Sequence, residues 1–125
     1  MPENLIKSMG SEKTMPVNID VTGEVVTARL DGELDHHTAA QIRSEIDSAI
    51  EKARPTLVII DFRELTFMDS SGIGLVMGRY KKAREVGAEL HITNTSPQIY
   101  KVMRLSGIER LAVIDKGGYK NETDK

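Results

Sequence analysis

The sequence predicts one α/β domain, in which α-helices pack against a mostly parallel or mixed β-sheet. The chain has 125 residues, a length that suits a single domain with its own hydrophobic core. Short runs of β-branched and apolar residues alternate with segments in which apolar residues recur at helical spacing. Strands that alternate with helices usually pair in parallel through right-handed crossovers. We therefore expect a largely parallel sheet behind an opening hairpin.

The composition excludes several classes of protein. The chain has no cysteine, which rules out disulfides and thiolate metal sites. Its net charge is −2, with acids and bases interspersed, which does not favour binding to nucleic acid or to an anionic membrane. No apolar run approaches the roughly 18 residues of a membrane-spanning helix, and the N-terminus has no apolar signal core. We therefore expect a cytoplasmic protein that contacts neither nucleic acid nor membranes directly.

The first part of the chain predicts a leader and a β-hairpin. Residues 1–14 are polar and aperiodic, so we expect a flexible leader before a domain that spans residues 15–115. Residues 17–21 alternate apolar and polar side chains, as a half-exposed strand does. Thr22-Gly23-Glu24 is a turn signal, and residues 25–30 form the second strand of the hairpin.

A first helix is expected after a turn at Asp31-Gly32. Thr38-Ala39-Ala40-Gln41 has the form of a capping box, in which the Thr and Gln side chains satisfy exposed backbone amides. Arg54-Pro55 ends the helix, because the residue before proline avoids the helical conformation. The apolar residues at helical spacing, which predict its buried face, are Ile42, Ile46, Ala49, Ile50 and Ala53.

The most apolar strand, residues 57–60, leads into the segment from Phe67 to Gly74. Within it, Ser70 and Ser71 lie where a loop meets the N-terminus of a helix. A serine hydroxyl at such a place either caps the free backbone amides of the first turn or is exposed and open to phosphorylation. The helix itself is predicted by apolar residues at positions i, i+3, i+4 and i+7, namely Ile73, Val76, Met77 and Tyr80.

The remaining elements follow from similar signals. Gly74 and Gly78, four residues apart, indicate close packing of the serine helix on a neighbour or on a partner. Gly87 suits the left-handed position after that helix. Ser96-Pro97 predicts the start of a helix that extends to residue 105 and ends before Gly107. The flanking strands are expected over residues 89–93 and 111–114, with a polar tail at 116–125, and the last helix is expected to bury Ile99, Val102 and Met103.

No motif in the chain predicts catalysis, a metal or a cofactor. A serine nucleophile would need a base, yet there is no GxSxG elbow and the chain has only 3 histidines. His36-His37 lacks metal-ligand spacing, because adjacent side chains point in different directions and no HExxH is present. A phosphate-binding GxxxxGK[ST] motif is also missing. We therefore expect a protein that is not an enzyme and that needs no cofactor.

Two strings of residues resemble the signatures of a known family. The segment from Phe67 through Asp69-Ser70-Ser71-Gly72 to Lys81 closely resembles the signature of the anti-sigma factor antagonists, or anti-anti-sigma factors, of the STAS fold. Gly32-Glu33-Leu34-Asp35-His36-His37-Thr38-Ala39 resembles a second signature, in the form found in the sporulation branch of that family. The order of the predicted elements agrees over residues 15–114.

The resemblance implies a partner-switching protein that regulates transcription positively. In that family, the unmodified protein binds an anti-sigma factor that is also a serine kinase, and so frees a sigma factor. The kinase phosphorylates the serine directly after the aspartate, here Ser70, and the complex falls apart. A metal-dependent serine phosphatase resets the switch. Ser71 is then the neighbour that does not accept the phosphate.

The resemblance also implies a partner surface, because both signatures should meet at one edge of the sheet. We expect Arg79 and Lys82 on the exposed side of the serine helix, at the rim of that surface. A second hypothesis is a STAS regulatory module that senses a small ligand, such as a nucleotide, at the same helix terminus. Family members usually carry another helix after the last strand, whereas a polar tail follows here. The expected partner-binding residues are Gly32, Glu33, Asp35, His36, Asp69, Ser71, Gly72 and Arg79.

Overall fold

Five strands form one mixed sheet in the order β1-β2-β3-β4-β5 in this computed structural model, which describes residues 15–114. Strand β1 pairs antiparallel with β2, and every other neighbouring pair is parallel, so the predicted hairpin and α/β class are confirmed. The predicted leader and polar tail lie outside the described residues. The elements are β1 (Val17–Thr22), β2 (Val25–Leu34), α2 (His36–Ala53), β3 (Leu57–Met68), α3 (Ser71–Glu85), β4 (Glu89–Thr93), α4 (Pro97–Ser106), the 3-10 helix η1 (Ile108–Arg110) and β5 (Val113–Ile114).

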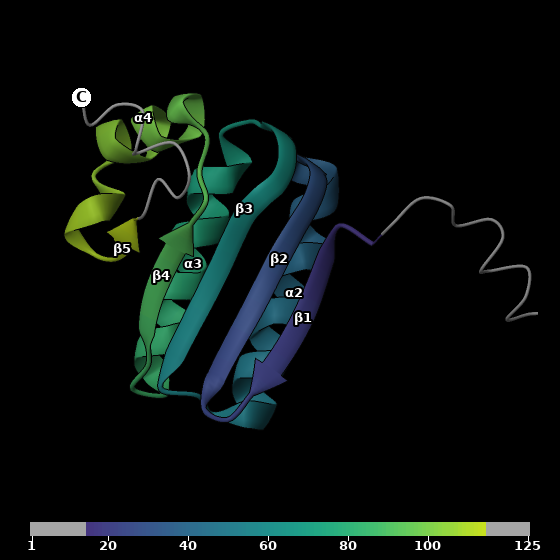
Figure 1. Cartoon of the computed structure of the whole chain (residues 1–125), viewed down its shortest axis with the longest axis vertical. Helices are drawn as coiled ribbons and strands as arrows, with labels where there is room; N and C mark the ends of the chain where they lie inside the picture. The colour runs from purple at the N-terminus through teal and green to yellow at the C-terminus, as the bar shows by residue number, and fades with distance from the viewer. Residues whose placement is uncertain (1–14, 115–125) are drawn as a thin grey trace, which may run out of the picture.

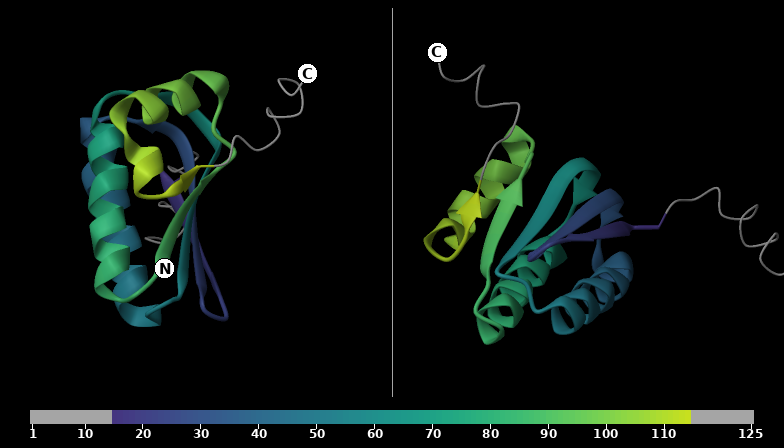
Figure 2. Two further views of the ribbon diagram at one scale, coloured as in Figure 1. Left: turned by 90° about the vertical axis from the view of Figure 1, so that its left-hand side faces the viewer. Right: turned by 60° about the horizontal axis from the view of Figure 1, so that its bottom comes forward.

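Helices α2 and α3 lie side by side against one face of the sheet, and α4 lies at the end where β3 finishes (Figures 1 and 2). The core fills the space between the two helices and the sheet. Its sheet side comes from alternate residues of the central strands, such as Ala28, Ile60 and Ile92. No helix among residues 15–114 is long and apolar enough to cross a bilayer.

The junction between β2 and α2 differs from the prediction in two ways. Strand β2 does not turn at Asp31-Gly32 but continues to Leu34, still paired with β3. The pairing of β2 with β3 shifts register between Arg29 and Asp31 and again between Gly32 and Glu33, as at a β-bulge. Gly32 adopts a φ of +86° there. The expected capping box at Thr38 is also wrong, because the N-cap is Asp35 and Thr38 is the third helical residue. The predicted burial of Ile42, Ile46 and Ile50 is confirmed, whereas Ala49 and Ala53 are only half-buried.

Helix α3 buries a different face from the one predicted. Val76 is buried as expected, but Met77 is 37% exposed, and Ile73 and Tyr80 are only half-buried. The face that packs on the sheet and on α2 instead carries Leu75, Val76 and Arg79. The buried residues of α3 are Gly72, Leu75, Val76, Arg79 and Ala83.

The two glycines of α3 that suggested close packing do not contact a neighbouring element. A Cβ atom added to Gly74 or to Gly78 would meet no atom within 4 Å. The prediction that they pack on a neighbour within the described chain is therefore wrong, and packing on a partner stays a prediction. Gly87, with a φ of +80°, lies just past the helix as expected.

Helix α4 begins as predicted but presents one unexpected side chain to solvent. The Ser96 hydroxyl accepts a hydrogen bond from the Ile99 amide at 3.2 Å, and Gly107 ends the helix with a φ of +86°. Val102, expected in the core, is instead 43% exposed. Strand β5 is shorter than expected and begins at Val113.

Candidate functional site

The two segments that carry the family resemblance meet at one edge of the sheet. Strands β2 and β3 pair in parallel up to Leu34 and Met68, so both end at the same level. The Asp69 amide donates a hydrogen bond of 3.1 Å to the Leu34 carbonyl, which ties the β3–α3 junction to the β2–α2 junction. This edge, at the carboxyl ends of parallel strands, is where open α/β sheets usually place their sites.

Asp69 and Ser71 together form the start of α3. The Asp69 Oδ1 atom accepts a hydrogen bond from the Ser71 hydroxyl at 2.5 Å and another from the Ser71 amide at 2.8 Å. These two bonds, the hydroxyl bond first, lower the pKa of Asp69 below its usual value. The carboxylate is therefore charged at neutral pH and holds the Ser71 hydroxyl in place.

Ser70 lies at the N-cap position of α3 but does not act as a cap through its side chain. Its backbone is already helical, with φ −65° and ψ −16°, and its hydroxyl makes no capping hydrogen bond. The residue is exposed, and its hydroxyl pairs with no group among residues 15–114. Of the two roles that the sequence left open, capping is thus excluded for the Ser70 side chain, and an exposed hydroxyl at a helix N-terminus remains.

Asp35 plays the corresponding part at the start of α2. Its Oδ1 atom accepts hydrogen bonds from the Thr38 amide at 3.0 Å and from the His37 amide at 2.9 Å, and the Thr38 hydroxyl accepts one from the Asp35 amide at 3.1 Å. The Thr38 amide is the main cause that lowers the pKa of Asp35. His36 and His37 are exposed, with ring centroids 4.2 Å apart.

The two carboxylates and His36 are close enough to influence one another. The charge of Asp35 acts to raise the pKa of Asp69, whereas His36 acts to lower it. The edge around Ser70 therefore combines two helix N-termini with two aspartates and an exposed imidazole. Glu33, also exposed, extends the acidic character along the end of β2.

Gly72 is buried and does not lie on the surface next to Ser70. A Cβ atom there would overlap the Met68 side chain and would lie 3.1 Å from a Leu34 methyl group. The first turn of α3 therefore sits directly on the ends of β2 and β3. We correct the expectation for Gly72: it places Ser70 at the edge of the sheet but does not offer a contact surface.

The expected exposure of Arg79 is wrong. The residue is only 6% exposed, and its Nε atom lies 2.8 Å from Oδ1 of Asp47 on α2. Its guanidinium also donates to the Leu75 carbonyl at 3.4 Å. Burial lowers the pKa of Arg79, and the neighbouring Asp47 opposes that shift. Arg79 therefore joins α3 to α2 instead of lying at a rim.

Lys82, the other expected rim residue, is partly exposed and engaged in ion pairs. It pairs with Glu51 of α2, and its amine lies 3.7 Å from a carboxylate oxygen of Glu85. The hydrogen bond to Glu51 is the main cause that raises the pKa of Lys82. The exposed residues of α3 on the side of Ser70 are instead Gly74, Met77 and Lys81.

A groove lined by the residues just before Asp69-Ser70 was not expected from the sequence. It has a volume of about 560 Å³ and lies between the end of β3 and α4. The residues that line the groove are Leu65, Thr66, Phe67, Met68, Ser96, Gln98, Ile99, Lys101 and Val102.

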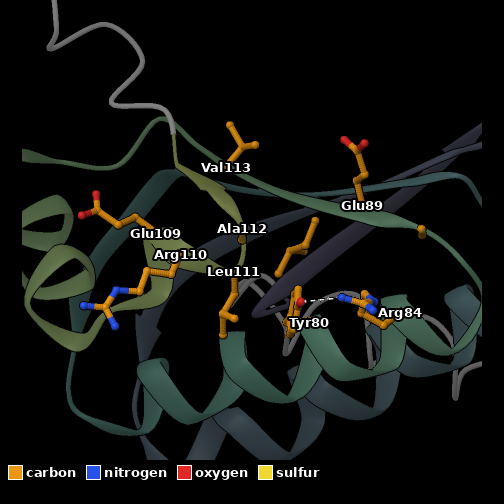
Figure 3. Close-up of a pocket in the computed structure, with 10 residues that line it drawn as sticks. Tyr80, Arg84, Glu89, Glu109, Arg110, Leu111, Ala112 and Val113 are labelled. Carbon is orange, nitrogen blue, oxygen red and sulfur yellow. Dashed lines mark hydrogen bonds between the residues drawn. The ribbon is translucent and has the colours of Figure 1, made fainter.

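A second hollow, of about 380 Å³, lies far from the serine, between the end of α3, the start of β4 and the η1–β5 segment (Figure 3). Tyr80, on the wall of this hollow, lies about 15 Å along α3 from Ser70, because an α-helix rises 1.5 Å per residue. Within it, Arg84 donates a hydrogen bond of 2.8 Å to the Tyr80 hydroxyl. None of the expected site residues lines this hollow, so the geometry at the β3–α3 junction defines the candidate site.

Known proteins resemble the chain in sequence and in fold. The model of the STAS domain family matches residues 16–119. The anti-sigma F factor antagonist of Paenibacillus polymyxa is 35% identical over 100 residues, which is 80% of this chain and 82% of the relative. That of Lysinibacillus sphaericus is 46% identical over 88 residues, which is 70% of this chain and 75% of the relative.

Two solved structures of the anti-sigma factor antagonist SpoIIAA share this fold. The unphosphorylated form is 41% identical with a TM-score of 0.69, over 78% of this chain and 86% of that one. The phosphorylated form, from Bacillus, is also 41% identical, with a TM-score of 0.64 over 78% of this chain and 89% of that one. From the match to the family model and the identity to these relatives, the chain belongs to the anti-sigma factor antagonists of the STAS domain family.

Proposed function

We propose that this protein is a phosphorylation-controlled partner switch whose acceptor is Ser70. In its unmodified form it binds an anti-sigma factor that is also a serine kinase, and a sigma factor is released. The observation that carries the proposal is the Ser70 hydroxyl, which is exposed at the N-terminus of α3 and pairs with no group among the described residues. A solved relative, SpoIIAA, exists in phosphorylated and unphosphorylated forms, which supports the same conclusion.

The local charges explain how one phosphate would end the interaction. A phosphoserine carries about −1.5 to −2 charges and three strong acceptor oxygens. In the free protein, the N-terminus of α3 offsets part of that charge. Against a partner, the phosphate would have to lose its water beside the Asp69 carboxylate, with Asp35 nearby. Dissociation therefore follows from local repulsion and desolvation, without refolding.

The partner surface consists of the two loops at this edge and the exposed side of α3. The loop between β2 and α2 contributes Glu33 and His36, which are exposed, and Gly32 and Asp35 shape it. On α3, Gly74 presents no side chain, so a partner can approach the helix backbone closely. The protein itself catalyses nothing in this scheme: the partner supplies the kinase, and a metal-dependent serine phosphatase removes the phosphate.

The decisive experiment measures phosphate incorporation by mass spectrometry. The purified protein is incubated with ATP and the serine-kinase anti-sigma factor of the same organism. We expect the wild-type chain, Ser71→Ala and the control Ser44→Ala, an exposed serine of α2, to take one phosphate. Ser70→Ala should take none and should stay bound to the kinase in the presence of ATP. Phosphate on Ser71 in the wild-type chain would contradict the assignment of the acceptor.

A further inference from the structure

The groove between the end of β3 and α4 is apolar and open to solvent. Phe67 on its β3 side is 49% exposed, and Val102 on its α4 side is 43% exposed. Leu105, one turn further along α4, is 79% exposed and extends the same surface. Large apolar side chains that gather on a surface mark interaction sites more often than single exposed ones do.

The groove is lined by residues that lead directly into the proposed phosphorylation site. Phe67 and Met68 are the last residues of β3, and Asp69-Ser70 follow them directly. A kinase that encloses the Ser70 hydroxyl has to cover the end of β3, and a specific interface covers about 800 Å² on each partner. The groove therefore falls within the area that a partner bound at Ser70 would reach.

The charge of the groove indicates what its occupant carries. Among the lining residues, Lys101 is the one ionisable side chain, and it is exposed on α4. The edge around Ser70, by contrast, is acidic, with Glu33, Asp35 and Asp69. A partner that fits both regions carries basic groups opposite the acidic edge and a carboxylate opposite Lys101.

We propose that this groove is a second docking site for the anti-sigma kinase, which inserts an apolar side chain flanked by a carboxylate. The proposal rests on the proposed function, because it assumes that the kinase binds at Ser70. Ser70 does not line the groove, whose β3 side ends at Met68, two residues earlier. Contacts in the groove therefore contribute equally to the complex before and during phosphoryl transfer. Loss of such uniform binding raises KM and leaves kcat unchanged.

The experiment measures the Kd for the purified kinase with adenine nucleotide, and kcat and KM for phosphorylation of the full chain. The variants are Val102→Ser, Leu105→Ser and Lys101→Glu, with Val113→Ser as the matched control because it is 55% exposed but lines the distant hollow. We expect about tenfold higher Kd and KM for Val102→Ser and Lys101→Glu, with kcat within twofold of wild type. Val113→Ser should change none of these values by more than twofold.

The outcomes separate the two proposals. If Ser70→Ala binds the kinase while Val102→Ser, Leu105→Ser and Lys101→Glu all bind within twofold of wild type, the docking site is wrong and the proposed function stands. If the wild-type chain neither binds the kinase nor accepts phosphate, the proposed function is wrong and the docking site fails with it. If the protein forms a dimer in the absence of the kinase and Leu105→Ser dissociates that dimer, the groove binds a second copy of this chain. That result would overturn the proposal.

Discussion

Asp69 accepts two hydrogen bonds from Ser71, one from the hydroxyl at 2.5 Å and one from the backbone amide at 2.8 Å. Adjacent serines in the same motif thereby acquire different chemistry. The hydroxyl of Ser71 is held by a charged carboxylate, while that of Ser70 has no partner among residues 15–114. A kinase that needs a free hydroxyl can accordingly distinguish Ser70 from Ser71 by the hydrogen bonding of their side chains alone.

Ser70→Ala should fold with little loss of stability. Because the Ser70 hydroxyl makes no capping hydrogen bond, we expect the free energy of unfolding to change by about 0.5 kcal/mol or less. Urea unfolding of the variant and the wild type measures this difference. A loss of more than about 1 kcal/mol, the usual cost of removing a cap, would show that the hydroxyl does stabilise the helix start.

Asp69→Asn should change how stability depends on pH. The folded-state pKa of Asp69 is lowered below 3.8, so its charge stabilises the folded protein above that pH and this contribution is lost as the pH falls through the folded pKa. The difference in melting temperature between wild type and Asp69→Asn should therefore be largest near neutral pH and shrink below about pH 3.8. Asp20→Asn, on the exposed side of β1, is the control. An equal difference at pH 3 and pH 7 would contradict the role assigned to this carboxylate.

Arg79→Ala should destabilise the fold even though Arg79 is a charged residue on a helix. The substitution leaves the partly buried Asp47 carboxylate without its partner, and we expect a loss of about 2 kcal/mol in the free energy of unfolding. Lys81→Ala, on the exposed side of the same helix, should change it by about 0.5 kcal/mol or less. Chemical denaturation of both variants tests the contrast, and equal losses would show that the α2–α3 ion pair contributes little.

Gly74→Ala and Gly72→Ala should have opposite effects on stability. At Gly74 an added Cβ meets nothing within 4 Å, so the higher helix propensity of alanine should stabilise the protein by about 0.5–1 kcal/mol. At Gly72 it would overlap Met68 and crowd Leu34, so we expect a lower melting temperature. If the partner packs on the α3 backbone, Gly74→Ala should also bind the kinase more weakly despite its greater stability. Unchanged binding would remove Gly74 from the partner surface.

Much of the fold follows from signals that act over a few residues. Gly23 in the hairpin turn, Pro55 after α2, the cap at Ser96 and the positive φ of Gly87 all have local causes, and the sequence predicts each of them. The motif around Ser70 could likewise be located at a strand-to-helix junction, because the apolar strand and the helical period flank it directly. Local backbone preferences and the motif itself thus determined the order of elements and the family.

The tertiary structure decided which side chains are available. Arg79 looks like an exposed cation in its helix, and only the approach of Asp47, 32 residues earlier on α2, makes its burial favourable. The N-cap of α2 is Asp35 and not the expected Thr38, because β2 continues past Gly32 and brings the aspartate to the helix start. The groove exists only because α4 comes to lie beside Phe67. Contacts between residues distant in sequence depend on how elements pack, and no local pattern encodes that packing.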